Sequence, residues 1–431
     1  MTISSRNKLL WYLDILGALA MYLYVLTTYV AHDVIIKSYA NSISLYTFLA
    51  LVLFKTVLEI RKFPRTSRFT LWYLLFTIFS FIVMLYSPEV KLFDSTFYSI
   101  FVAFALIFSF ELYLKSENSF KCLVWCYAIS GFATVLLLFF TGNLEGNPSD
   151  RLGQDFFGNA NDFASLMMIA AMCALWLTIY TRSARKILPF LFFLADMYAL
   201  VLSGGRKYFV IPFVFLYFIL LFKRDRKGRV HIFRVTLIFA VLFFAVLIAI
   251  MKIPFLYESI GVRMEGLIQA FLGTGGDNSS LVRADMRNAA IAEWKKAPLF
   301  GYGLDSFKYY ALEHFEHFYY SHCNYTELLY SGGIFYFILY YFMFAKIAFE
   351  AFRRKALASP YRAFAIAVPV CLFILDFGAV SFYSPHNLIM LLLACKCLTF
   401  SNTDVLNEGV KPQHFAFLRK KNNLPDSAEN V

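Results

Sequence analysis

Long apolar runs alternate with short polar gaps along almost the whole chain. A helix needs about 20 apolar residues to cross the hydrocarbon core of a membrane, and most of the runs approach that length. The pattern therefore predicts twelve membrane-spanning helices, near residues 9–31, 38–60, 70–87, 95–114, 120–140, 163–180, 187–203, 208–222, 235–251, 328–345, 361–382 and 387–400.

Composition excludes the other broad classes of protein. Of the 431 residues, 60% are hydrophobic and only 16% are charged, and the mean hydropathy is +0.62. The aromatic residues lie within the apolar runs, which is not the pattern of a soluble, fibrous or disordered chain. The predicted fold class is an all-α polytopic membrane protein, because in lipid a helix satisfies all of its own backbone hydrogen bonds.

The distribution of positive charge predicts the orientation. The formal net charge is +12, and every second gap between the predicted spans is basic. Basic loops stay on the cytoplasmic side, so these gaps and both termini are expected to be cytoplasmic. The charge is thus a topology signal, and no nucleic-acid partner is expected. The basic gaps hold 26 of the 40 lysines and arginines, near residues 6–8, 61–68, 115–121, 182–186, 223–234, 346–362 and 411–421.

The remaining gaps are expected to face outward. No small-residue cleavage site follows the first apolar run, so that run is expected to stay as a span. The seven cysteines are scattered, mostly within apolar runs, and are expected to pack rather than to form a disulfide framework. The outward gaps are residues 32–37, 88–94, 141–162, 204–207, 252–327 and 383–386. The chain then divides into spans 1–9 (residues 1–251), a large outer loop (252–327), spans 10–12 (328–400) and a cytoplasmic tail (401–431).

The outward loop 141–162 surrounds Arg151 with glycines and asparagines. It ends at Asn161 and Asp162, one of which is expected to cap the span that follows, because short polar side chains accept hydrogen bonds from the first backbone amides of a helix. A loop that carries an arginine in such polar surroundings is a candidate binding segment. A turn-rich connector is the alternative interpretation.

The segment Ser203-Gly204-Gly205-Arg206-Lys207 joins two spans in very few residues, so Arg206 is expected near the membrane boundary. Two cations on the outward side run against the positive-inside rule. Arginine binds phosphate through two parallel hydrogen bonds, and the glycines can free backbone amides beside it. The segment therefore predicts an anion-binding site, and side chains that only extend to the membrane surface are the alternative.

The large outer loop contains a predicted helix that starts near Asp277 and ends before Pro298. Arg283 and Arg287 are four residues apart, so they share a face of this helix and repel each other. A bound anion would reverse that repulsion. The alternative is a solvated face on which nearby acidic residues offset the charge.

Three histidines, His314, His317 and His322, follow in the same loop. His314 and His317 can share a helix face, but they lack a recognisable metal-ligand framework and no metal is predicted. His322 stands at the mouth of the tenth span, where an imidazole is well placed for proton transfer. Glu327 follows about one turn later and either orients that imidazole or caps a helix.

Two carboxyl groups, those of Asp14 and Asp376, fall inside predicted spans. Ionisable groups within a membrane are functional candidates by default, and the sequence identifies no partner for either of them. The triplet Asp376-Phe377-Gly378 lacks the accompanying motifs of a kinase, so it is interpreted as packing or a kink.

Four of these segments carry a family resemblance when they are taken in order along the chain. They are Arg151 to Ala164 with Asn161, Ser203-Gly-Gly-Arg206, Ser280 to Gly303 with Arg283, and Ser321-His322 with Glu327 and Gly333. Together they resemble the arginine-glycine-asparagine loop, the serine-arginine loop, the start of the large periplasmic loop and the closing histidine motif of the O-antigen polymerase and O-antigen ligase superfamily. The resemblance covers roughly residues 145–345, and Cys323 and Phe335-Tyr336 depart from the family pattern.

The resemblance implies a metal-independent, inverting glycosyltransferase without a cofactor, in a bacterial inner membrane and with its active site on the periplasmic side. Its donor would be an undecaprenyl-diphosphate-linked glycan and its acceptor another lipid-linked glycan or the lipid A core. Membrane lipid, a flippase and chain-length regulator proteins are the other expected partners.

The same chemistry assigns roles to the candidate residues. Cations must face the charge that grows on a diphosphate leaving group, and a base must accept the proton of the attacking hydroxyl. The predicted catalytic residues are His322, Arg206 and Arg283, and the predicted substrate-binding residues are Arg151, Arg287, Asn161 and Glu327.

Two alternatives stay open. Within the superfamily, the stretch Asn324 to Gly333 looks more like polymerases, which extend lipid-linked repeat units, than like ligases, which transfer the glycan to the lipid A core. A transporter or flippase of lipid-linked glycan is the alternative from another class. Such proteins place their charges in the midplane of the bundle, whereas here the charges gather at its outward ends.

Overall fold

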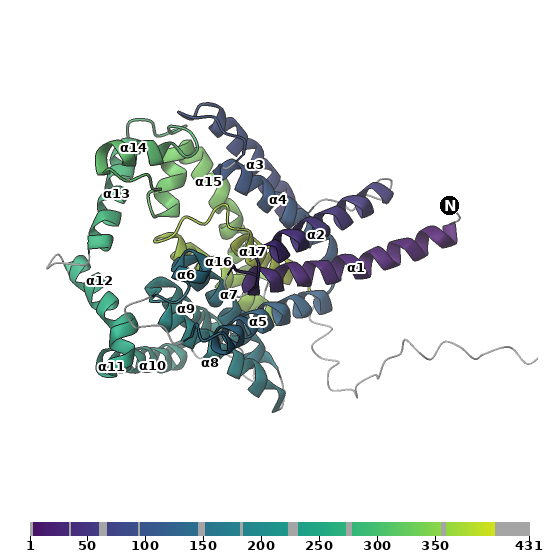
Figure 1. Cartoon of the computed structure of the whole chain (residues 1–431), viewed down its shortest axis with the longest axis horizontal. Helices are drawn as coiled ribbons and strands as arrows, with labels where there is room; N and C mark the ends of the chain where they lie inside the picture. Colours follow the sequence, from purple (N-terminus) through teal and green to yellow (C-terminus); the bar gives the residue numbers. More distant parts are fainter. Residues whose placement is uncertain are drawn as a thin grey trace, which may run out of the picture.

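The chain forms helices joined by loops (Figure 1). The computed structural model describes residues 3–33, 36–59, 67–93, 95–144, 151–181, 184–222, 232–272, 278–354 and 359–400, and the predicted tail 401–431 lies outside them. The helices of the first half are α1 (Ile3–Val30), α2 (Tyr39–Leu58), α3 (Arg68–Leu85), α4 (Thr96–Tyr113), α5 (Glu117–Phe140), α6 (Gln154–Phe157), α7 (Ala160–Tyr180), η2 (Ala184–Lys186), α8 (Ile187–Leu202) and α9 (Arg206–Phe222). Those of the second half are α10 (Ile232–Lys252), α11 (Pro254–Leu256), η3 (Tyr257–Gly261), α12 (Val262–Leu272), α13 (Asn278–Trp294), α14 (Ser306–Phe315), α15 (Asn324–Arg353), α16 (Ser359–Asp376) and α17 (Pro385–Cys397).

Each of the twelve predicted spans coincides with a helix. Among the helices that the structure describes, eight are long and apolar enough to cross a membrane: α1 to α5, α7, α10 and α15. The other four predicted spans are helices α8, α9, α16 and α17, of 16, 17, 18 and 13 residues. The all-α polytopic membrane fold is therefore confirmed, and the number of twelve spans stays a prediction.

Helix α7 lies at the centre of the bundle. It packs against α5, α8 and α9, and 78% of its most apolar window is buried. Its alanines allow neighbouring backbones to approach closely, as small residues do in membrane helix pairs. Gly131 of α5 faces Ala170 at such a contact, where a larger side chain would overlap with α7.

Helix α10 is apolar, but the other described helices bury very little of its surface. No residue of its most apolar window is buried, so its side chains are available to lipid. From α10 the chain passes through α11 and α12 into α13 and α14, which lie along one side of the bundle in Figure 1. The large outer loop is thus mainly helical, and the predicted helix near 277–298 is α13.

The turn between α13 and α14 is held against α15 by hydrogen bonds. Helix α15 is interrupted at Gly333, whose backbone (φ 69°, ψ −165°) is not helical. The carbonyls of Tyr330 and Ser331 next to the break accept hydrogen bonds from the amides of Tyr302 and Gly303, each at 2.8 Å. The turn therefore supplies the hydrogen bonds that the interrupted helix lacks.

Asp14, for which the sequence identified no partner, forms a salt bridge with Lys55 that joins α1 to α2. The Lys55 side chain is fully buried while that of Asp14 is half exposed. A buried ammonium group requires such a counter-charge, and this gives Asp14 a structural explanation.

Candidate functional site

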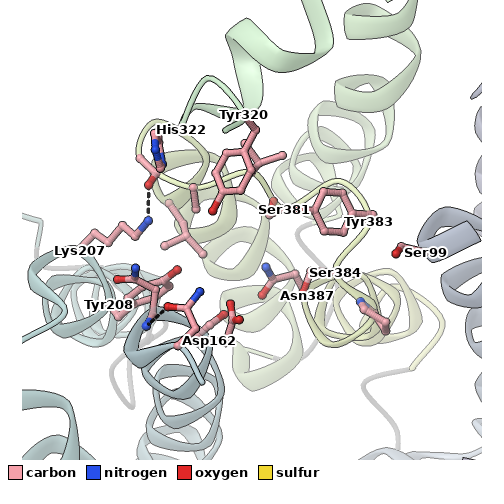
Figure 2. A pocket seen from close by; sticks show the side chains of 18 of the residues that line it. Ser99, Asp162, Lys207, Tyr208, Tyr320, His322, Ser381, Tyr383, Ser384 and Asn387 are labelled. Atoms are coloured by element: carbon pink, nitrogen blue, oxygen red, sulfur yellow. Dashed lines mark hydrogen bonds between the residues drawn. The ribbon is translucent and has the colours of Figure 1, made fainter. Parts of the chain in front are cut away.

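A cavity of about 370 Å³ opens where the ends of several helices meet (Figure 2). Its walls come from the first turns of α4, α7, α9 and α17, the end of α16, the α16–α17 loop, helix α13 and the turn before α15. These segments lie in or border five of the predicted outward gaps. The gaps that the charge pattern assigns to the outer side therefore converge on one site.

Two basic side chains line the cavity, Arg283 from α13 and Lys207 from α9. Burial first, and then Arg283 and Arg151, lower the pKa of Lys207 to about 7. Among the residues that the structure describes, none forms a hydrogen bond or a salt bridge with the Arg283 guanidinium. The Lys207 ammonium donates to the Gly378 carbonyl and lies 4.8 Å from the centre of the Tyr208 ring. Within the described residues neither cation has a carboxylate in salt-bridge contact.

Arg206, predicted as a catalytic cation, is not among the residues that line the cavity. Its guanidinium donates to the carbonyl of Arg263 in α12. The backbone amides of Gly204, Gly205 and Arg206 all donate to acceptors within the 201–204 turn. The expectation that the glycines leave backbone amides available to an anion is therefore wrong, because these amides already donate hydrogen bonds within the tight turn.

Arg151 ties the 151–162 loop to the start of α9. Its guanidinium donates to the Ser203 carbonyl at 2.9 Å and to the side-chain oxygen of Asn161 at 3.0 Å. Burial, together with the nearby Arg263 and Arg283, lowers the pKa of Arg151 to about 10. Arg151 therefore stays charged at neutral pH and adds to a cluster of cations beside the cavity.

The cap of α7 differs from the prediction. Neither Asn161 nor Asp162 caps this helix, because it starts earlier, and Asn159 accepts the hydrogen bond from the Asn161 amide at 2.9 Å. This leaves the side chains of Asn161 and Asp162 on the first turn, where both line the cavity.

His322 stands in the turn before α15 and lines the cavity. Its φ of 58° is left-handed, a conformation that costs a non-glycine residue roughly 1 to 3 kcal/mol and occurs often at functional sites. Its ring packs edge-on to Tyr320, and within the described residues neither ring nitrogen has a hydrogen-bond partner. Burial first, and then Arg283, Lys207 and Arg287, lower the pKa of His322 to about 4. The imidazole is therefore neutral at physiological pH.

Glu327 orients the turn that carries His322 rather than the imidazole itself. Its buried carboxylate accepts the backbone amide of Ser321 at 2.8 Å. Thr326 adds hydrogen bonds to the Ser321 hydroxyl at 2.9 Å and to the Cys323 carbonyl at 3.1 Å. These contacts hold the left-handed backbone of His322 in place.

Arg287 lies beside the cavity without lining it. Its guanidinium is 5.2 Å from the centre of the Phe377 ring, in the loop that follows α16. Burial, with a contribution from Arg283, lowers the pKa of Arg287, and Arg283 and Arg287 repel each other as expected for their shared helix face.

Asp376, the second carboxyl without a predicted partner, belongs to a buried network beneath the cavity. It accepts hydrogen bonds from the Tyr341 hydroxyl at 2.8 Å, from the Asn324 amide at 3.2 Å and from the Ser381 hydroxyl. The Asn324 side-chain oxygen in turn accepts the backbone amide of Ser381 at 2.9 Å. The network clamps the α16–α17 loop, which forms a wall of the cavity, to the start of α15.

The predicted span 361–382 therefore ends early, at Asp376. The residues beyond it are apolar enough to extend a hydropathy run, but Gly378 and the hydrogen bonds of Ser381 to Asp376 and Asn324 turn them into a loop. Polar side chains inside predicted spans were the available signal for this network.

The other two histidines of the large loop lie apart from the cavity lining. His314 stacks on Tyr310 with ring centres 4.1 Å apart, and His317 contacts Tyr319. Among the described residues no group of three His, Cys, Asp or Glu side chains is arranged to hold a metal ion. The seven cysteines are free thiols.

Residues 190–341 match the family model for O-antigen ligase. The matched segment runs from α8 into α15 and contains Arg206, Lys207, Arg283, Arg287, His322 and Glu327. Among curated proteins, none matches the chain. The predicted resemblance is confirmed over these residues: the chain is a membrane protein with an O-antigen ligase domain, which is found in ligase- and polymerase-type membrane enzymes of polysaccharide biosynthesis.

Proposed function

We propose that the protein is a metal-independent, inverting glycosyltransferase that polymerises undecaprenyl-diphosphate-linked repeat units on the periplasmic side of the bacterial inner membrane. The observation that carries the proposal is a cavity at the helix ends predicted to face outward, lined by two basic side chains without a salt bridge to any described residue and by a neutral imidazole. The O-antigen ligase domain fits a lipid-linked glycan substrate.

The cations suit the leaving group. When the bond between the anomeric carbon and the diphosphate breaks, the negative charge on the diphosphate grows, and fixed positive groups stabilise it. Arg283 offers a guanidinium to which no described residue forms a hydrogen bond, and Lys207, which lies near His322 in Figure 2, adds a second basic group. Arg151 and Arg287 contribute from farther away, and Arg206 holds α9 against α12.

His322 fits the role of the general base. The hydroxyl of the acceptor sugar attacks the anomeric carbon from the face opposite the diphosphate, which inverts the configuration at that carbon. The hydroxyl proton passes to a nitrogen of the neutral His322 imidazole, a new glycosidic bond forms, and undecaprenyl diphosphate leaves. Negative charge on the bound diphosphate offsets the cations that lower the pKa of His322, so the imidazole becomes a stronger base when the donor is bound.

An O-antigen ligase is the second candidate, and the description of the matched family favours it. The two candidates differ in the acceptor alone. Transport of lipid-linked glycan is a weaker candidate, because the basic residues that line the cavity lie at helix ends rather than within the midplane of the bundle.

Deletion of the gene separates these candidates. If the protein is a polymerase, a gel of surface glycan from the deletion strain will show core bearing single repeat units. Bare core would indicate a ligase instead, and unchanged glycan would exclude both activities.

Substitution of Arg283 tests the site itself. In a purified assay with the cell's own lipid-linked repeat units, Arg283→Ala should lower the transfer rate roughly 100-fold or more, the usual cost of losing a group that stabilises transition-state charge. Lys91→Ala is the matched control, since Lys91 is an outward cation that pairs with Glu89 and does not line the cavity. Excess EDTA should leave the wild-type rate unchanged. Normal transfer by Arg283→Ala, or loss of activity in EDTA that added metal restores, would contradict the proposed mechanism.

A further inference from the structure

The residues that line the cavity form two chemically different groups. Lys207, Arg283 and His322 form the basic group. The rest of the polar lining is uncharged except for Asp162, the one carboxylate among the described residues that line the cavity. This second group includes Tyr98, Ser99, Asn159, Asn161, Ser165, Ser384 and Asn387.

Asn387, on the first turns of α17, has a buried side-chain oxygen without a partner among the described residues. The residue is only 5% exposed, and its side-chain oxygen has no hydrogen-bond donor within the described part of the chain. A buried polar group left in this state costs roughly 1 to 3 kcal/mol, so such groups normally have a partner. Figure 2 draws the Asn387 amide pointing into the cavity toward Asp162. The missing partner therefore belongs to whatever fills the cavity.

The Asp162 carboxylate makes its immediate surroundings unsuited to phosphate. A carboxylate only accepts hydrogen bonds, and it repels a second anion. The Asn387 amide both donates and accepts, so the pair offers two acceptors and one donor group to a ligand. A sugar ring with adjacent hydroxyls fits this combination, because each hydroxyl both donates and accepts.

We propose that Asp162 and Asn387 form a subsite for one sugar residue of the glycan, with the diphosphate directed to Lys207 and Arg283. This assignment rests on the proposed function, since it concerns the orientation of that lipid-linked substrate. Asp162 and Asn387 select the sugar hydroxyls, and the cations hold the lipid diphosphate.

The test compares two lipids that differ only in the glycan. Equilibrium binding to the full chain in lipid nanodiscs is measured by microscale thermophoresis for undecaprenyl diphosphate and for the lipid-linked repeat unit, extracted from cells that lack the gene. Asn387→Leu keeps the size of the side chain and removes both polar atoms. Its affinity for the repeat unit should fall about fivefold, the effect of one lost hydrogen bond to an uncharged group, while its affinity for undecaprenyl diphosphate stays within twofold of wild type.

Asp162→Asn is a second, nearly isosteric variant, and it should also weaken binding of the repeat unit more than binding of the bare lipid. Asn143→Leu is the matched control, because Asn143 bonds to Thr141 at the end of α5 and does not line the cavity. Equal losses for both lipids, or no loss for either, in the variants of Asn387 and Asp162 would overturn the subsite. If wild-type protein binds neither lipid, the proposed function fails, which is a different result.

Discussion

At the scale of single residues, His322 shows how the site links charge to proton transfer. Burial and three cations lower the pKa of its imidazole from 6.5 to about 4. Since the unfolded chain binds the proton more tightly, His322 contributes stability that is complete above pH 6.5 and declines as the pH falls toward 4. At neutral pH the imidazole is therefore unprotonated and ready to accept a proton.

This leads to a prediction about reactivity. Diethyl pyrocarbonate modifies neutral imidazole, and mass spectrometry resolves the modification at His322 as a function of pH. In the wild-type protein the half-maximal rate should fall near pH 4 instead of near 6.5. Arg283→Ala should move it upward, because it removes the cation that, after burial, lowers the pKa of this ring most. A wild-type midpoint at 6.5 or above would show that the cations do not act on this ring.

Residue types at outward positions were sufficient to predict part of the site. Arg283, His322 and Asn161 line the cavity. The sequence singled them out because a cation, an imidazole or an amide is uncommon next to a membrane span. The choice between Arg206 and Lys207 was not predictable, since adjacent residues of a helix point about 100° apart and only the packing of α9 decides which one faces the cavity. Asn387 was missed because it lies at the edge of an apolar run.

At the scale of secondary-structure elements, the break in α15 is the place where the outer loop is hydrogen-bonded to this helix. The interrupted helix exposes two carbonyls, and the turn at Tyr302 and Gly303 binds both of them. The amide of Ile334, just beyond the break, donates to the Pro298 carbonyl at 2.9 Å. The same α15 carries Asn324 and Glu327 beside His322, so the junction fixes the outer loop relative to the site.

Substitution of Gly333 tests this junction. Gly333→Ala should lower the free energy of unfolding by roughly 1 to 3 kcal/mol, because φ of 69° with ψ of −165° is a region that only glycine adopts readily, and the added Cβ would overlap with the Leu299 carbonyl. Gly142→Ala is the control: Gly142 has a similar φ of 72°, but nothing lies within 4 Å of an added Cβ. Thermal unfolding in detergent measures both. Equal melting temperatures for the two variants would show that the contact at Gly333 carries no stability.

Hydropathy predicted where the helices lie because lipid requires long apolar segments with satisfied backbones. It did not predict where they stop. Helix α16 ends at Asp376, and the turn beyond it depends on hydrogen bonds from Asn324, which is 52 residues away in the chain. Contacts of that kind follow from tertiary packing and leave no periodic signal in the sequence.

At the scale of the whole molecule, the charge pattern and the position of the site agree. The cavity lies among segments that belong to or border the predicted outward gaps, and the described residues next to the basic gaps lie at the other ends of the same helices. Each of the five segments predicted to face outward contributes few polar residues, so the site exists only when the bundle is assembled. The convergence of these segments could not be deduced from any one of them.

The orientation of the bundle gives the last prediction. Single cysteines are placed at positions 148 and 315 on the predicted outward side and at 226 and 354 in basic gaps, in protein whose exposed Cys122 has been replaced by serine. A membrane-impermeant maleimide added to intact spheroplasts should label positions 148 and 315 only, because the positive-inside rule keeps the basic gaps in the cytoplasm. Permeabilised spheroplasts serve as the control in which position 354 also reacts. Labelling of 226 or 354 in intact spheroplasts would reverse the orientation, and the cavity with His322 and Arg283 would then face the cytoplasm, where a periplasmic lipid-linked glycan cannot reach it.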